Sequence, residues 1–327
     1  MNFMIVFFLM IFIWKFSMAQ DINSSINWQE YKQKYLKENS YIIDPYNNRV
    51  TSEAQGYGMI LALKYNDKEV FDSIYKWTKI NLQRQDNLFS WLWNGSVVDK
   101  NNATDGDLLI AYGLFKAYKK WKEDYYLQEF NTLNNSLKKL IVNIKIKNDI
   151  DTLLLPAVYG FSNEKYEITL FPSYYIEFIL KEFSENDKDW KDVYRSLDKI
   201  YRLKNISTNI RYPLIEKKFF TSGTSDLDVY RIIAYSYLTG KLNINLKSSF
   251  EEIDKFFKKN GYIPFTFKYN SDKQEQRESP FCVYKFFYLL YKDNKYLQKY
   301  KDLVKTDKNN YFCDSFELLL EGHLSED

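Results

Sequence analysis

Helical periodicity is the sequence feature that most constrains the fold. Apolar residues recur at intervals of three and four through many segments, which is the spacing that gives an α-helix one apolar face. Polar turns separate these segments, and strand-like alternation is sparse, with Tyr262–Asn270 the best candidate. The clearest predicted helices are Ser52–Tyr65, Lys68–Leu82, Asp105–Trp121, Tyr126–Ile144, Ser173–Phe183, Asp189–Leu203, Asp226–Leu238, Phe250–Phe257, Phe281–Tyr291 and Tyr311–Leu320. We therefore expect an all-α domain, and hairpins stacked around an axis, a bundle and a solenoid all fit this pattern.

The scarcity of histidine limits the chemistry that the chain can perform. His323 is the only histidine among 327 residues, so a histidine-based metal cluster is excluded, and a Ser-His-Asp triad would depend on that one residue. Any catalysis is expected to rest on carboxylates, hydroxyls, Lys or Arg. The formal net charge of +3 is too small to indicate a nucleic-acid partner.

The first residues form a short apolar run with small residues at Ser17 and Ala19, which predicts a signal peptide over residues 1–19. The run is too short to span a bilayer comfortably, but no Lys or Arg precedes it and Lys15 follows it, so a retained N-terminal anchor is the alternative. Either interpretation places the rest of the chain outside the cytoplasm, secreted, periplasmic or at the cell surface. Residues 20–327 contain no long linker and are expected to form one domain.

Two cysteines, Cys282 and Cys313, are compatible with one disulfide in an exported chain. Two separate buried thiols are the alternative interpretation. They are too few for a metal site of their own.

The first candidate site is Glu53 in the stretch "TSEAQGYGMILAL". Ser52 and Gln55 fit a capping box, which would place Glu53 in the first helical turn, where an acid complements the helix dipole. Gly56 and Gly58 are costly there, at roughly 1 kcal/mol each against alanine. A second interpretation is therefore that these glycines clear room beside Glu53 for a bulky ligand.

The second candidate site lies in "NNATDGDLLIAYGLFKAYKKW". Thr104 or Asp105 can cap the helix that follows, and Asp107 falls in its first turn. Capping does not require two carboxylates around a permissive glycine. Just upstream, Trp91 and Trp93 suit either a sugar ring, whose C–H face stacks on aromatic rings, or the protein core.

The third candidate site is "TSGTSDLDVYR", which carries Asp226, Asp228 and Arg231. Asp228 and Arg231 are three residues apart and so share one helix face. The arginine can orient the carboxylate and keep it ionised, although a simple intrahelical ion pair explains the spacing equally well.

Taken together, the three motifs resemble glycoside hydrolase family 8. The first family motif reads roughly Ser-Glu-Gly-x-Gly-Tyr-Gly-Met, and this chain has "SEAQGYGM", with Ala54 in place of a glycine. The second is Ala-Thr-Asp-Gly-Asp followed by an apolar helix that ends in an aromatic residue. It appears here as "ATDGDLLIAYGLFKAYKKW", with Gly113 where the family usually has Ser or Ala.

Further segments extend the resemblance along the chain to about Leu320. "LFPSYY" resembles the family's Asn-Pro-Ser-Tyr with Phe171 in place of the asparagine, and "NNYFCDSFELLL" resembles its final aromatic pair and helix. The third motif departs from the family's Tyr-Asp-Ala-x-Arg. It keeps the aspartate and arginine but has Leu227 for the tyrosine and Val229 for the alanine, which bears on substrate choice more than on chemistry.

The resemblance implies an (α/α)6 barrel with few strands and one catalytic domain over residues 20–327. The activity implied is that of an inverting endo-β-1,4-glycanase. Glu53 would be the general acid and Asp228 the base, their carboxyls standing roughly 6.5–9.5 Å apart, while Asp105 would bind the sugar at the cleavage point. Asp226 is a second candidate for the base. This chemistry requires no metal or cofactor.

The resemblance also implies a β-1,4-linked polysaccharide substrate: a cellulose-like or mixed-linkage glucan, xylan, chitosan or an amino-sugar exopolysaccharide. The predicted substrate-binding residues are Tyr57, Trp91, Trp93, Asp107, Tyr174, Arg231 and Tyr311. We expect a monomer, and association with an exopolysaccharide synthase complex fits a chain without an appended binding module. A non-catalytic carbohydrate-binding relative and an exported helical interaction protein are the alternatives.

Overall fold

The computed structural model describes residues 24–38, 40–45, 48–147, 149–163, 166–307 and 309–322. The predicted signal peptide and His323 lie outside these ranges. Within them, no helix combines the length and apolar character needed to cross a membrane.

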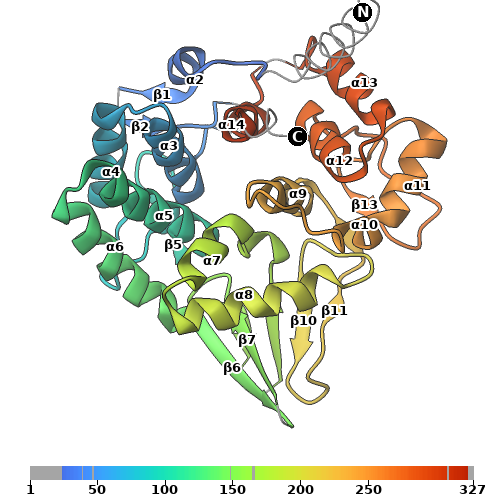
Figure 1. Cartoon of the computed structure of the whole chain (residues 1–327), viewed down its shortest axis with the longest axis horizontal. Coiled ribbons are helices and arrows are strands. Elements are labelled where there is room, and N and C mark those ends of the chain that lie inside the picture. Colours follow the sequence, from blue (N-terminus) through green and yellow to red (C-terminus); the bar gives the residue numbers. More distant parts are fainter. Residues whose placement is uncertain are drawn as a thin grey trace, which may run out of the picture.

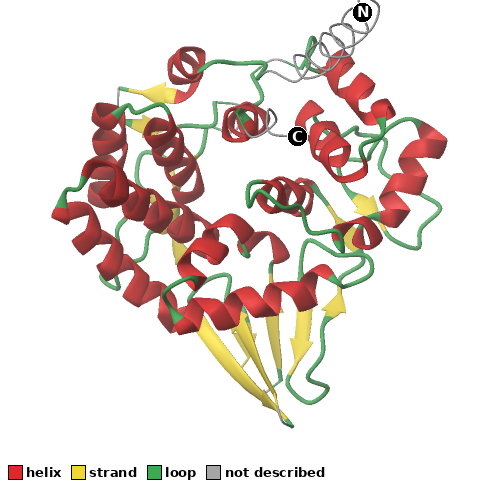
Figure 2. Ribbon diagram, in the orientation of Figure 1, coloured by secondary structure: helices red, strands yellow, loops and turns green. Residues whose placement is uncertain are grey.

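Helices make up most of the described chain (Figure 2). They are α2 (Trp28–Tyr35), α3 (Ser52–Lys64), α4 (Lys68–Leu82), α5 (Thr104–Trp121), α6 (Asp124–Leu137), α7 (Glu177–Ser184), α8 (Lys188–Tyr201), α9 (Leu227–Tyr237), α10 (Leu246–Ser249), α11 (Glu251–Asn260), α12 (Phe281–Tyr291), α13 (Asn294–Leu303) and α14 (Tyr311–Leu320), with short 3-10 turns at Lys138–Leu140 and Pro172–Tyr174. The predictions for α4, α12 and α14 agree residue for residue, because each of these helices is bounded by a local polar turn.

Six of these helices form a closed inner ring. In order around the ring, α3 packs on α5, α5 on α7, α7 on α9, α9 on α12, α12 on α14, and α14 returns to α3 (Figure 1). The other helices pack outside their chain neighbours, for example α4 on α3, α6 on α5, α8 on α7 and α13 on α12. The expected (α/α)6 barrel is therefore confirmed.

Amphipathicity separates the inner helices from the outer ones. The outer helix α8 buries a single stripe that includes Trp190, Val193, Leu197 and Ile200, spaced by three and four. The inner helix α3 is buried on all sides from Ala54 onward for most of its length, as expected for a helix with neighbours all round. The core accordingly lies between the inner ring and its outer cover.

Short β-strands lie in the connections between the helices of the barrel. Two-stranded sheets pair β1 (Leu36–Lys37) with β2 (Tyr41–Ile42), β6 (Ile141–Ile146) with β7 (Asp149–Leu154), and β12 (Thr224–Ser225) with β13 (Phe267–Lys268). One sheet has the order β3 (Val50–Thr51), β4 (Ser90–Trp93), β5 (Val97–Asn102), and another the order β11 (Phe220–Thr221), β10 (Ile210–Pro213), β9 (Glu167–Leu170), β8 (Ser162–Asn163). All pairs are antiparallel, and β6, β7, β10 and β11 project from one side of the barrel (Figure 1).

One helix prediction and one strand prediction need correction. The predicted helix Tyr126–Ile144 ends as α6 at Leu137, and the chain then enters β6. Ile141 and Ile144 keep a helical spacing of three, but pairing with β7 overrides that weak local preference. Within the predicted strand Tyr262–Asn270, the extended pairing is confined to Phe267–Lys268.

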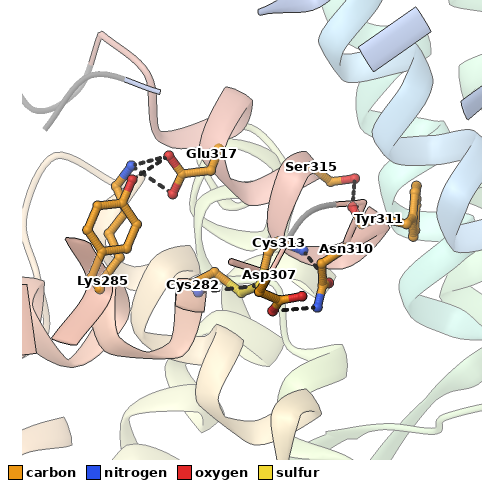
Figure 3. The surroundings of a disulfide bond; sticks show 9 residues. Cys282, Lys285, Asp307, Asn310, Tyr311, Cys313, Ser315 and Glu317 are labelled. Atoms are coloured by element: carbon orange, nitrogen blue, oxygen red, sulfur yellow. Dashed lines mark hydrogen bonds and ion pairs between the residues drawn. A yellow bond between two sulfur atoms is a disulfide. The ribbon is translucent and has the colours of Figure 1, made fainter. Parts of the chain in front are cut away.

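Covalent and ionic cross-links hold α12 to α14 (Figure 3). Cys282 and Cys313 form a disulfide, so the first interpretation of the two cysteines is confirmed. One turn further along, the buried Lys285 amine lies 3.0 Å from both carboxylate oxygens of Glu317, and Tyr300 donates its hydroxyl to the same carboxylate at 2.9 Å. These links fix the start of α14, which carries Tyr311, against the barrel.

Candidate active site

A cleft of about 440 Å³ opens at the mouth of the barrel where α3, α5 and α9 begin. Glu53 comes from the first turn of α3, Asp105 from the first turn of α5 and Asp228 from the first turn of α9. The three sequence motifs are far apart in the chain, and the ring brings all of them to one end. The start of α14 and strand β4 complete the wall, with Tyr311 and Trp91.

Helix α3 begins differently from the predicted capping box. Thr51, and not Ser52, is the N-cap, and its hydroxyl accepts the Ala54 N–H at 3.1 Å. The Gln55 side chain forms two 2.8 Å hydrogen bonds with the backbone N–H and carbonyl of Ile42, and its amide also donates to the Thr51 carbonyl at 3.1 Å. Gln55 therefore anchors β2 to α3, and Glu53 stays in the first turn as predicted.

The glycines of the first motif allow close packing of α3 against its neighbours. A Cβ at Gly56 would collide with Leu109 on α5, and a Cβ at Gly58 would lie 2.5 Å from Ile42. Gly56 and Gly58 thus let α3 approach its neighbours closely, and the interpretation that they clear space for a ligand is wrong.

Gly106 brings the two acidic helix starts together. A Cβ at this position would lie 2.8 Å from the backbone nitrogen of Glu53 and would also collide with the Ser52 hydroxyl. The glycine of the Asp-Gly-Asp motif is therefore what allows the first turn of α5 to touch the first turn of α3. This contact sets the spacing between Glu53 and Asp105.

The two acids that flank Gly106 have different surroundings. Asp105 lines the cleft, with a side chain only 2% exposed, and accepts the N–H of Gly106 at 2.8 Å. Asp107 is fully buried and accepts the Phe89 N–H at 2.8 Å and the Asn102 amide at 2.9 Å. Asp107 thus ties β4 and β5 to α5, and the prediction that it binds substrate is not supported.

The predicted caps of α5 are also absent. The N-cap position is Ala103, without a side-chain cap, and Thr104 donates its hydroxyl to the Leu155 carbonyl at 2.7 Å. The α5 start is held instead by the loop after β7, because Thr104 N–H also donates to the Pro156 carbonyl at 2.9 Å.

Arg231 sits among all three cleft carboxylates. Its guanidinium donates to Glu53 Oε1 and, at 3.0 Å, to Asp105 Oδ2, while Asp228 Oδ1 lies 3.7 Å away. The arginine side chain is 1% exposed. The predicted partnership with Asp228 is therefore the weakest of the three ion pairs. The main effect of Arg231 is to compensate the negative charges of Glu53 and Asp105, which are largely removed from water. Because the arginine side chain is itself buried, its predicted contact with substrate is limited.

Burial shifts the titration of the two inner acids. Removal from water raises the pKa of Glu53, and the negative charge of Asp228 raises it further. The positive charge of Arg231 lowers this pKa, but the net shift is upward. Burial, reinforced by the charge of Glu53, raises the pKa of Asp105 to about 8. The side chain of Asp228 is 56% exposed and projects into the cleft. The arrangement thus separates two acids with raised pKa values from a more accessible carboxylate.

Asp226 lies two residues before Asp228 on the same wall of the cleft. It is the N-cap of α9, and its carboxylate accepts the Asp228 N–H at 3.1 Å. Burial, and then the charge of Asp228, raise its pKa. One carboxylate oxygen of Asp226 is therefore used by the helix cap. This favours Asp228 over Asp226 as the candidate base.

Three of the five predicted aromatic platforms line the cleft: Trp91, Tyr174 and Tyr311. Tyr57 does not, because it is 1% exposed and its hydroxyl is hydrogen-bonded to that of Tyr235. Tyr57 offers no ring face to a sugar, so the prediction that it binds substrate is not supported.

Trp93 also packs away from the cleft. Its ring makes edge contacts with Trp77 at 5.1 Å and Tyr41 at 5.9 Å between centroids. Successive side chains of a strand point to opposite faces, so Trp91 and Trp93 would share a face in a regular strand. The pairing of β4 with β5 is irregular between Ser90 and Trp93, and this bulge separates the two indoles.

Two further aromatic residues in the cleft were missed as site residues, Phe265 and Phe312. Phe312 could have been predicted from the sequence, because it is the second aromatic residue of the "NNYFCD" segment that resembles the family's final aromatic pair. Phe265 lies in the stretch that was interpreted as a strand. A second cavity of about 760 Å³ shares Phe265, Phe312, Tyr311 and Leu227 with the first and continues toward the start of α12. The binding surface is therefore an extended groove.

A helical barrel whose mouth gathers buried and accessible carboxylates in an extended groove has the features of a glycoside hydrolase. The family model described as glycosyl hydrolases family 8 matches residues 1–325. The chain therefore belongs to glycosyl hydrolase family 8.

Individual relatives agree with this membership. An endoglucanase of Cellulomonas uda is 37% identical over 164 residues, which cover 48% of this chain and 45% of that protein. An endoglucanase of Escherichia coli O157:H7 is 28% identical over 260 residues, covering 72% and 69%. The crystal structure of an endoglucanase from Komagataeibacter sucrofermentans superposes with a TM-score of 0.75 at 25% identity, covering 92% of this chain and 96% of that one. The first of these alignments spans less than half of the relative.

Proposed function

We propose that the chain is an exported, inverting endo-β-1,4-glycanase that acts on a cellulose-like glucan or a bacterial exopolysaccharide. The observation that carries this proposal is the meeting of Glu53, Asp105 and Asp228 around Arg231 at the mouth of the barrel. Glycoside inversion needs one protonated carboxyl and one ionised carboxylate on opposite sides of the scissile bond.

In the proposed reaction, Glu53 donates its proton to the glycosidic oxygen as the bond from that oxygen to the anomeric carbon breaks. Asp228 accepts a proton from a water molecule whose oxygen bonds to the anomeric carbon from the opposite face. The product has inverted configuration, Glu53 is left ionised and Asp228 protonated, and exchange of one proton with solvent restores both. Asp105 holds a hydroxyl of the sugar at the cleavage point.

The electrostatics support these roles. The raised pKa of Glu53 favours the protonated form of this carboxyl, which is the form that an acid catalyst requires. Asp228 is more than half exposed, which suits a base that must meet water. Arg231 keeps a positive charge beside Glu53 after proton donation, so the ionised product state is stabilised.

The shape of the groove supports action within a polymer. Two cavities of about 440 and 760 Å³ share lining residues, and together they exceed the space of one sugar ring. Both relatives in sequence and the structural relative are named endoglucanases. The disulfide supports export, because such bonds persist in oxidising compartments. Association with an exopolysaccharide synthase complex stays a prediction, which co-purification from the producing strain would test.

Reducing-end release from a panel of polysaccharides tests the proposal. The panel contains carboxymethylcellulose, lichenan, glucomannan, xylan and chitosan, and the variants are Glu53→Gln and Asp228→Asn. Glu69→Gln is the matched control, because Glu69 is an exposed acid in the first turn of the neighbouring helix α4. We expect the first two variants to lose at least about 100-fold in kcat and the control to keep it. NMR of the first-formed anomer reports inversion.

Two results would contradict the proposal. Full activity of Glu53→Gln would mean that another group is the acid. No hydrolysis of any polymer, with sugar binding retained, would identify a non-catalytic carbohydrate-binding relative.

A further inference from the structure

An exposed tyrosine stands on the loop that follows β7. Tyr159 is 65% exposed, and a single exposed aromatic residue carries little meaning by itself. What distinguishes Tyr159 is the density of contacts that fix it relative to the catalytic cleft.

The backbone of this loop is attached to the start of α5. The side chain of Asn101 donates to the Tyr159 carbonyl at 2.9 Å and accepts its N–H at 3.4 Å. The next residue, Asn102, accepts the Val158 N–H at 2.8 Å and donates to Asp107 in the first turn of α5. Tyr159 is thus held by the same segment that leads directly into Asp105.

The ring of Tyr159 is supported from one side. The guanidinium of Arg84 lies 5.7 Å from the ring centroid. That guanidinium is itself fixed by two bonds to Asp86, at 3.1 and 2.8 Å, and by one to the Lys100 carbonyl at 2.6 Å. The arginine covers one face of the tyrosine ring, and the high exposure of Tyr159 leaves the rest of the ring open to solvent.

Strand pairing places the Tyr159 loop near the wall of the cleft. Strand β4 pairs with β5 so that Ser90 faces Asn102 and Leu92 faces Asp99, which places Trp91 across from the intervening segment that includes Asn101. Trp91 lines the catalytic cleft, and Asn101 carries Tyr159. Tyr159 is therefore held next to the wall of the cleft that Trp91 forms, and it lies outside the set of residues that line the cleft.

We propose that Tyr159 is the platform of an outer sugar subsite, where the C–H face of a pyranose unit of the β-linked glycan stacks on the tyrosine ring beyond Trp91. Sugar rings stack on aromatic faces, and a platform fixed before binding loses little conformational freedom. This inference rests on the proposed function, since it takes the same glycan as the ligand. It adds a specificity element that selects long chains over short ones.

The test compares Tyr159→Ala with Tyr166→Ala. Tyr166 is 63% exposed and lies just before β9 without the Asn101 and Arg84 contacts, so it controls for the loss of an exposed aromatic ring. Binding is measured by affinity electrophoresis in gels containing lichenan or carboxymethylcellulose, with every variant in the Glu53→Gln background. Hydrolysis by the single variants is followed on cello-oligosaccharides of two to eight units, a roughly fourfold range of substrate length.

We expect Tyr159→Ala to weaken binding to the polymer roughly 3- to 10-fold, the loss of one stacking contact. KM should rise on long oligosaccharides with kcat unchanged, short ones should be unaffected, and Tyr159→Phe should behave as wild type. Equal affinity of Tyr159→Ala and wild type, an equal loss in Tyr166→Ala, or an equal effect at all substrate lengths would overturn the inference. Because the gel assay needs no catalysis, a failure of hydrolysis in the parent enzyme would refute the proposed reaction and leave this test intact.

Discussion

Gly106→Ala is the substitution whose effect follows most directly from the structure. The new Cβ would lie 2.8 Å from the backbone nitrogen of Glu53, where ordinary van der Waals contact begins at 3.4 Å. The Ser52 hydroxyl, which it would also meet, can rotate, but the Glu53 nitrogen is part of helix α3. The starts of α3 and α5 must therefore separate by about 0.6 Å, the difference between these two distances.

This displacement acts on the two acids that Arg231 joins, Glu53 and Asp105. Glu53 and Asp105 lie on either side of the Gly106 contact, and both are bonded to Arg231. A misplacement of about 1 Å costs roughly 100-fold in rate, so about 0.6 Å corresponds to a loss of roughly 10-fold in kcat. Overpacking costs about 1–3 kcal/mol of stability, partly offset by the helical preference of alanine, so the rate is the more sensitive measurement.

Gly113→Ala is the matched control on the same helix. A Cβ at Gly113 would lie 3.4 Å from the nearest atom of Met59, which is an ordinary contact. This variant should keep the wild-type kcat and gain up to about 1 kcal/mol in stability. Initial rates of reducing-end release at saturating glucan and thermal unfolding are measured for both variants. A Gly106→Ala enzyme with wild-type kcat and melting temperature would refute the idea that this glycine sets the spacing of the acids.

Three further perturbations test other parts of the structure. Burial raises the pKa of Asp107 from 3.8 to about 7, so the folded state holds this proton more tightly and stability falls as pH rises between these values. Asp107→Asn should remove that fall, so its melting temperature relative to wild type should increase from pH 4 to 7; a constant difference would contradict the assignment. Replacing Cys282 and Cys313 by Ser should cost about 3–4 kcal/mol in urea unfolding, from the 31-residue separation of the linked cysteines, and dithiothreitol should have no further effect on this variant. Glu317→Gln should destabilise by about 3–5 kcal/mol because it leaves Lys285 charged and buried, whereas Lys285→Met with Glu317→Leu should unfold at higher urea than Glu317→Gln; the reverse order would exclude the ion-pair explanation.

The helical architecture could be predicted from the sequence because its signal is local. The interval between apolar residues along α4 or α12 is fixed by the helix itself, and so the bounds of these helices agree with the prediction. The placement of Glu53, Asp105 and Asp228 in first helical turns follows from the same local reasoning. Even the motif resemblance depends on short runs of neighbouring residues.

Contacts between distant segments could not be derived in this way. Arg231 is three residues from Asp228, yet it bonds more closely to Asp105, which is 126 residues away in the chain. Tyr57 lies in the same motif as Glu53, but the closing of the ring buries its ring against Tyr235. The hairpin of β6 and β7 was missed because strand pairing depends on a partner, and the helix-like spacing in that region is ambiguous.

The sequence by itself determined a mainly helical chain whose acids stand at helix starts, since helical periodicity and the position of a residue within a turn are local properties. Only the tertiary structure decided which acids share a cleft, which aromatic rings face a sugar, and why glycines occupy costly helical positions. Gly56 and Gly106 illustrate the reason: their missing side chains matter only because another helix touches them, and that neighbour is chosen by the closure of the whole ring.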